Sequence, residues 1–122
     1  MTSGYNREMQ TTQNGQKAET AASVYLEMRG YKILERNWRR PRYEIDIVAQ
    51  KDDVIFFVEV NYRFNDDQGG GLEAITKSKL KLMHYAGDAW TEETKWRGDV
   101  SLAAVEIAGD NFTVMSFVDN VY

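Results

Sequence analysis

Cysteine is absent from the sequence, and proline and histidine occur only once each. Without cysteine the protein forms no disulfide and no thiolate metal site, which fits the cytoplasmic location that we expect. No apolar run approaches the roughly 20 residues of a membrane-spanning helix, so we expect no membrane contact. Positive charge is not in excess, because the 122 residues carry a formal net charge of −4. Hydrophobic residues make up 43% of the chain, enough for the core of one compact domain.

Apolar periodicity and turn residues divide the chain into seven elements. The polar start, residues 1–13, is expected to be a disordered tail. A helix should follow over 15–29, where apolar residues recur at helical spacing and Gly30 is a typical C-cap. The other expected elements are strands at 31–34, 43–49 and 54–62, a helix at 72–93, and strands at 99–107 and 112–118. This α-β-β-β-α-β-β order predicts an α/β fold with a mixed β-sheet flanked by helices, in one domain of residues 14–122.

Two carboxylates lie inside segments that are otherwise apolar. Asp46 sits between Ile45 and Ile47, and Glu59 lies within the run Val54–Val60. A buried carboxylate costs free energy unless something pairs with it. A divalent cation could supply that pairing, and so could an arginine or lysine in an internal salt bridge. The spacing alone leaves these two alternatives open.

The expected strands bring the two acids together. Side chains two residues apart share one face of a strand, so Glu44 should point the same way as Asp46, and Asn61 the same way as Glu59. A short turn at 51–53 makes the two strands antiparallel neighbours, which places Asp46 close to Glu59. Oxygen ligands of this kind suit Mg²⁺ or Mn²⁺. Such a cation can polarise a phosphodiester and activate water for in-line attack.

Positive charge is concentrated in two clusters, at 29–42 and 77–81. The first holds six basic residues and one acid. Clusters like these on an acidic protein are compatible with a polyanion groove, and equally with ordinary solvated surface. Trp38 could stack a base between arginines, or belong to the core. The residues that we expect to contact phosphates are Arg39, Arg40, Arg42, Lys77 and Lys79.

Several short motifs occur in an order that is similar to a known family. Together they resemble the YraN-like family of small endonuclease-like proteins, over roughly residues 15–107. The motifs that carry the resemblance are Gly30-Tyr31-Lys32-Ile33-Leu34, Asn37-Trp38, Glu44-Ile45-Asp46, Val58-Glu59-Val60, Glu73-Ala74-Ile75 and Asp99-Val100. Single motifs such as Glu-Val are weak signals, but their ordered combination is specific.

The resemblance implies a core like that of the restriction-endonuclease-like PD-(D/E)XK superfamily, with a metal site on the second and third strands. It assigns the metal to Asp46 and Glu59, and it implies supporting roles for Glu44 and for Glu19 on the first helix. The motif lysine that follows the glutamate in this family is Asn61 here. Asparagine can hydrogen-bond water, but it carries no charge. The implied catalytic set is therefore Asp46, Glu59, Asn61, Glu44 and Glu19.

From the residues and the resemblance we expect a nucleic-acid-binding protein that resembles a Mg²⁺-dependent nuclease. It would hydrolyse phosphodiester bonds with little sequence specificity, because phosphate contacts position a duplex without reading it. DNA is the expected partner, and analogy with nucleases of this fold allows a homodimer. The alternative is a catalytically impaired nucleic-acid-binding or protein-interaction module that retains the fold, and Asn61 favours it.

Overall fold

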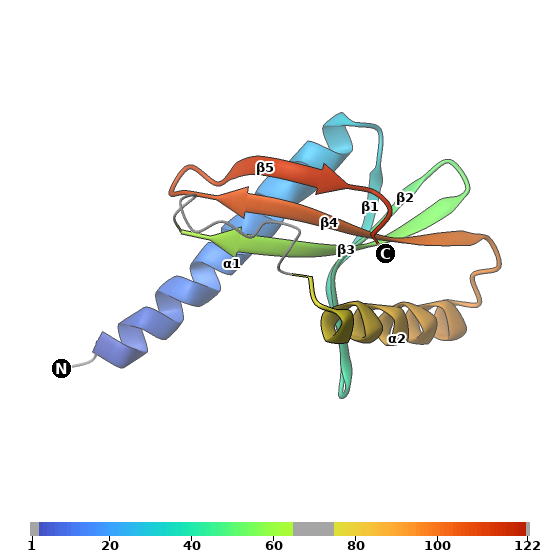
Figure 1. Ribbon diagram of the computed structural model, residues 1–122, viewed down its shortest axis with the longest axis horizontal. Coiled ribbons are helices and arrows are strands. Elements are labelled where there is room, and N and C mark those ends of the chain that lie inside the picture. The colour runs from blue at the N-terminus through green and yellow to red at the C-terminus, as the bar shows by residue number, and fades with distance from the viewer. Residues whose placement is uncertain (1–2, 65–74, 122) are drawn as a thin grey trace.

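A computed structural model of the protein describes residues 3–64 and 75–121, with side chains described from residue 12 onward (Figure 1). The order of the elements is α-β-β-β-α-β-β, so the predicted mixed α/β fold is confirmed. In chain order they are α1 (Ser3–Met28), β1 (Lys32–Arg40), β2 (Tyr43–Lys51), β3 (Val54–Arg63), α2 (Lys77–Thr94), β4 (Asp99–Ala108) and β5 (Thr113–Val118).

The strands form one five-stranded sheet in the order β1-β2-β3-β4-β5. All neighbours are antiparallel except β3 and β4, which are parallel. A parallel pair requires a crossover, and α2 lies in that connection. Each helix packs with its own apolar cluster, since Leu26 of α1 packs with Ile47 and Val58, whereas Met83 of α2 packs with Val48 and Phe57. The two helices therefore cover opposite faces of the sheet.

Two element boundaries near the N-terminus differ from the sequence-based expectation. The first helix begins at Ser3, so residues 3–13 of the expected disordered tail are helical in this structure. That stretch contains no proline, and a helix nucleated on its packed part can propagate through it. The first strand continues to Arg40 instead of ending at Leu34, because it pairs with β2 across a two-residue turn at Pro41–Arg42. Cross-strand pairing here outweighs the polar composition of the segment.

The second helix begins at Lys77 rather than at residue 72. Thr76 is its N-cap, with extended backbone and a side-chain oxygen that accepts a hydrogen bond from the Lys79 backbone N–H at 3.1 Å. Residues 72–74 of the expected helix lie outside the described residues. The cap fixes where the first turn of α2 starts, and therefore the point on the helix from which the Lys79 side chain extends.

Close packing against β3 holds α2 in place. A Cβ on Gly87 would lie 2.8 Å from Cδ2 of Phe57, so the ring lies against the helix backbone. The same ring makes an edge contact with Trp90, at 5.6 Å between centroids. Trp90 Nε1 in turn donates to Glu35 Oε2 at 2.7 Å, which ties α2 to β1. These contacts determine the position of the helix relative to the sheet.

The ladder between β2 and β3 stops one residue short of the two acids. Its last pair is Ile47 with Val58, so continued pairing would set Asp46 opposite Glu59. Instead the β1–β2 hairpin bends away from β3. Ile45 and Ile47 are only two residues apart, yet they pack in the clusters on opposite faces of the sheet. On β1, Asn37 lies opposite the bend with a φ of 52°, in the left-handed region.

Candidate metal and phosphate site

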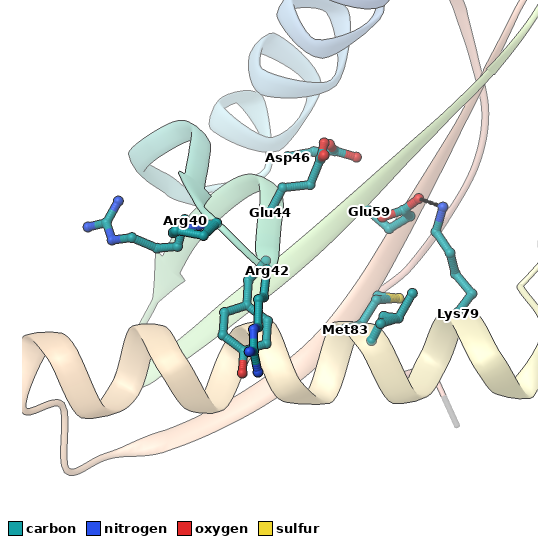
Figure 2. Close-up of a pocket in the computed structure, with 10 residues that line it drawn as sticks. Arg40, Arg42, Glu44, Asp46, Glu59, Lys79 and Met83 are labelled. Carbon is teal, nitrogen blue, oxygen red and sulfur yellow. Dashed lines mark ion pairs between the residues drawn. The ribbon is translucent and has the colours of Figure 1, made fainter.

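The bend of the hairpin opens a cavity of about 450 Å³ between the hairpin tip, β3 and α2 (Figure 2). One end carries acids and an ammonium group, and the other end carries the turn between β1 and β2. Aliphatic side chains of α2 form part of the wall. The lining residues are Arg40, Pro41, Arg42, Tyr43, Glu44, Asp46, Glu59, Lys79, Leu82 and Met83.

Asp46 lies at the point where the two strands separate. Its Oδ2 accepts a hydrogen bond from the Val60 backbone N–H at 2.8 Å. The carboxylate thereby takes the place that a carbonyl of β2 would hold in a continued ladder. Burial and, after it, the negative charge of Glu59 together raise the pKa of Asp46 to about 7, although the hydrogen bond from Val60 opposes the change. The charge of Glu59 therefore disfavours ionisation of Asp46.

Glu59 has a cationic partner from α2. Lys79 Nζ lies 2.6 Å from Glu59 Oε2, an ion pair drawn in Figure 2. The hydrogen bond to Glu59 raises the pKa of Lys79, and the charges of Asp46 and Glu44 add to the effect although partial burial opposes it. The ammonium thus contacts one carboxylate, Glu59, and is influenced electrostatically by the two others. The two acids are therefore paired in different ways. Glu59 forms an internal salt bridge with a lysine, whereas Asp46 accepts a hydrogen bond from a backbone N–H.

The two supporting acids approach Asp46 from different sides. Glu44 is exposed and lines the cavity. Glu19 comes from α1, and burial raises its pKa, although a hydrogen bond from the Asn37 side chain and the charge of Arg36 oppose this. The charges of Glu19 and Glu44 both raise the pKa of Asp46, so each of these predicted acids acts electrostatically on Asp46. Glu19 is not part of the cavity lining.

The donor set fits a divalent cation shared with solvent or substrate. Among the residues that the structure describes, no group of three or more histidine or carboxylate side chains is arranged to hold a metal ion. Asp46 and Glu59 do line the same cavity, and each has a second oxygen that takes no part in its contact with Val60 or Lys79. Mg²⁺ is commonly bound by one or two carboxylates, with water and phosphate oxygens completing its shell. A closed protein cage does not fit these residues.

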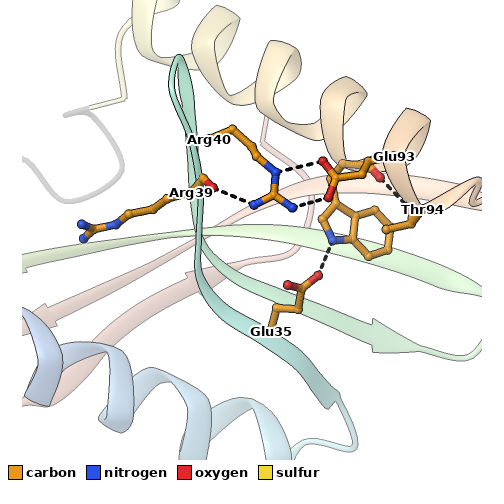
Figure 3. Close-up of polar contacts among 6 residues, drawn as sticks. Glu35, Arg39, Arg40, Glu93 and Thr94 are labelled. Atoms are coloured by element: carbon orange, nitrogen blue, oxygen red, sulfur yellow. Dashed lines mark hydrogen bonds and ion pairs between the residues drawn. The ribbon is translucent and has the colours of Figure 1, made fainter.

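The predicted phosphate contacts differ in how free they are. Arg40 donates from Nε to Glu93 Oε2 at 2.9 Å and makes a second contact with the other oxygen of Glu93 (Figure 3). Its guanidinium also lies 4.4 Å from the ring of Trp38, which is only 4% exposed and belongs to the core. Arg39 points away from this cluster, and Arg42 is exposed at the cavity. Arg40 therefore mainly fastens the hairpin to α2.

Several features of the site have no signal in the local sequence. The partners Lys79 and Glu59 are 20 residues apart, and their contact depends on the N-cap of α2 and on the bend of the hairpin. Asn37 adopts its left-handed conformation within a strand, where asparagine is the residue type that tolerates it best after glycine. In the sequence, this preference of asparagine is the one indication of the bend in the hairpin.

The fold and the cavity define a small α/β protein with a paired acid site at the edge where two strands separate. The chain belongs to the uncharacterised protein family UPF0102, whose model matches residues 18–107. This confirms the YraN-like resemblance at the level of the family. Within the described residues, none of the helices is long and apolar enough to cross a membrane.

Relatives from several organisms match most of the chain. A UPF0102 protein of Sulfurihydrogenibium sp. (strain YO3AOP1) is 41% identical over 103 residues, which is 84% of this chain and 90% of the relative. One from Cytophaga hutchinsonii is 33% identical over 106 residues, or 87% and 94% of the two chains. One from Flavobacterium johnsoniae is 32% identical over 114 residues, or 88% and 93%.

Proposed function

We propose that this protein is a metal-dependent nuclease that hydrolyses phosphodiester bonds in nucleic acid, DNA foremost, with little sequence specificity. Asp46 and Glu59 would hold Mg²⁺ or Mn²⁺, which polarises the phosphodiester when bound. Glu44 would keep the cavity negative on its open side, and Glu19 would do so from the face of α1. The resemblance to the restriction-endonuclease-like superfamily supports the same assignment.

The observation that carries the proposal is the acid pair itself. Asp46 and Glu59 line one cavity, and burial together with the charge of Glu59 raises the pKa of Asp46 to about 7. A site that brings two partly buried carboxylates together without a full complement of cations costs folding free energy. Functional sites are where proteins retain such costs, and a divalent cation would offset this one.

The surface around the cavity supports a polyanion as substrate. Arg42 sits on the exposed hairpin turn at one end of the cavity, and Lys77 is exposed on the first turn of α2. Arg39 is exposed on the same hairpin, although it points away from Arg40 and does not line the cavity. We place phosphate contacts on these three residues ahead of Arg40, since its donors are engaged with Glu93 and with the Arg39 carbonyl.

The test is cleavage of labelled single-stranded, duplex and branched DNA in Mg²⁺, in Mn²⁺ and in EDTA. The variant Asp46→Asn keeps an oxygen for the Val60 N–H and removes the charge. Asp110→Asn, on an exposed turn, is the matched control for the loss of one carboxylate. We expect metal-dependent cleavage by the wild type and by the control, and a loss of at least about 10²-fold in Asp46→Asn. Equal cleavage by all three proteins would reject the site.

The alternative is a catalytically impaired binding module, and Asn61 favours it. Asn61 lies on the same face of β3 as Glu59, and its Nδ2 is buried without a hydrogen-bond partner among the described residues. An uncharged amide cannot stabilise developing negative charge as an ammonium does. Metal-dependent DNA binding by a wild type that does not cleave, with cleavage by Asn61→Lys, would establish this alternative.

A further inference from the structure

Lys79 forms an ion pair with Glu59, one of the two acids, and this contact has a consequence for metal binding. Its Nζ lies 2.6 Å from Glu59 Oε2. The negative charges of Asp46 and Glu44 also stabilise the ammonium electrostatically. Both partners line the cavity. The ammonium thus neutralises part of the negative charge that a divalent cation would otherwise find there.

We propose that Lys79 is the counter-ion of Glu59 in the metal-free protein, and that this ion pair breaks when Glu59 becomes a metal ligand. The released ammonium of Lys79 then contacts the phosphodiester. This inference rests on the proposed function. A +2 charge placed between Asp46 and Glu59 repels an ammonium that is in contact with one of these ligands. The lysine must therefore move, or the cation is excluded.

The side chain of Lys79 is partly exposed, and its position on α2 directs it toward the cavity. Its side chain is 45% exposed, so part of its surface is open to solvent. Its backbone, in contrast, is fixed by the Thr76 cap. Leu82 and Met83 follow one turn later and line the same cavity, so the stem leaves the helix on the cavity side. A flexible four-carbon stem carrying a point charge can exchange a carboxylate for a phosphate within that space.

Lys81 provides a matched control. It lies two residues further along α2, is exposed, and has its Nζ 5.9 Å from the ring centroid of Tyr85. Lys81→Gln and Lys79→Gln change the net charge of the protein by the same amount. Any difference between the two variants therefore reports the position of the lost charge.

The first measurement is the affinity for Mn²⁺ alone, by titration calorimetry or electron paramagnetic resonance, without nucleic acid. We expect Lys79→Gln to bind Mn²⁺ about 3- to 10-fold more tightly than the wild type, since a partly exposed ion pair that competes with the metal is removed. Lys81→Gln should match the wild type. Unchanged or weaker Mn²⁺ binding by Lys79→Gln overturns the counter-ion role.

The second measurement is duplex binding, by fluorescence anisotropy in EDTA and in Ca²⁺. In EDTA, Lys79→Gln should weaken binding no more than Lys81→Gln does, because Glu59 holds the ammonium. In Ca²⁺ it should weaken binding about 3- to 10-fold more than the control. If Lys79→Gln weakens duplex binding relative to Lys81→Gln by the same factor in EDTA and in Ca²⁺, the release of Lys79 is overturned.

The outcomes separate this inference from the proposed function. Mn²⁺ binding that Asp46→Asn abolishes and Lys79→Gln leaves unchanged overturns the role of Lys79 and keeps the metal site. Mn²⁺ binding by Lys79→Gln but not by the wild type supports the counter-ion, overturns its release by the metal and rejects a metal enzyme in the natural chain. The absence of Mn²⁺ binding from every protein overturns both.

Discussion

Replacing Asp46 by asparagine should stabilise the cation-free protein at neutral and alkaline pH. Burial and the charge of Glu59 raise the pKa of this carboxyl from 3.8 to about 7. The folded state therefore holds the proton more tightly than the unfolded state does. The contribution to stability is greatest below about pH 4, falls as the pH rises from about 3.8 to about 7, and is level above that window.

The size of the effect follows from the same two values. At 1.36 kcal/mol per pH unit, (7 − 3.8) × 1.36 gives an upper limit of about 4 kcal/mol for the cost of ionising Asp46 in the folded protein. The cavity is open to water, which responds to the charge, so we expect about 1–3 kcal/mol. Asparagine retains an oxygen for the Val60 N–H and should preserve the hydrogen bond of 2.8 Å.

The assay is urea unfolding of the wild type and of Asp46→Asn in EDTA, at intervals from pH 4.5 to 8.5. The variant's advantage should grow with pH up to about 7 and then level off, whereas Asp110→Asn controls for the loss of one exposed carboxylate. Saturating Mn²⁺ should stabilise the wild type and leave the variant unchanged. An advantage that is independent of pH, or that shrinks as pH rises, would refute the account of the acid pair.

Three further predictions concern the packing of α2, a buried ion pair and the hairpin tip. Gly87→Ala should lower the free energy of unfolding by about 1–2 kcal/mol despite its better helix propensity, because the added Cβ meets the Phe57 ring at 2.8 Å; a more stable variant in urea would show that the ring moves freely. Glu106→Gln should cost about 2–4 kcal/mol in the same assay, because Arg63 Nη2 lies 2.8 Å from the buried Glu106 carboxylate, and a cost under about 0.5 kcal/mol would contradict this. Arg42→Gln should reduce the salt dependence of duplex binding by about one ion without changing stability, and an unchanged slope would remove Arg42 from the interface.

The architecture was predictable because its signals are local or periodic. The strand at 54–62 is apolar on both faces, which indicates a central strand, and β3 is indeed flanked by β2 and β4. Gly30 ends the first helix with a φ of 93°, as a left-handed cap requires. The long polar strand β1 was missed beyond Leu34, because its extension comes from pairing with β2 and not from its own composition.

The closeness of the two candidate acids was predictable, but their contacts were not. The positions of Asp46 and Glu59 inside apolar strands were sufficient to expect them near each other, and both line one cavity. The spacing could not show that β2 separates from β3 at Ile47, so that Asp46 binds a backbone N–H at that point. It could not assign Lys79 to Glu59 either, since that pairing depends on where Thr76 starts the helix. Tertiary geometry, which no local pattern encodes, supplies both contacts.

Asn61 and Lys79 are best understood together. A lysine at position 61 would share the face of β3 with Glu59 and would compete with Lys79 for its carboxylate. With asparagine there, Glu59 is left to the α2 ammonium at 2.6 Å. If Asn61→Lys activates cleavage, the effect should therefore be larger in the Lys79→Gln background, because the ammonium introduced at position 61 then has no second ammonium to repel it. If Lys79 already supplies the charge, Asn61→Lys should add little to the wild type, and Lys79→Gln should be rescued by it.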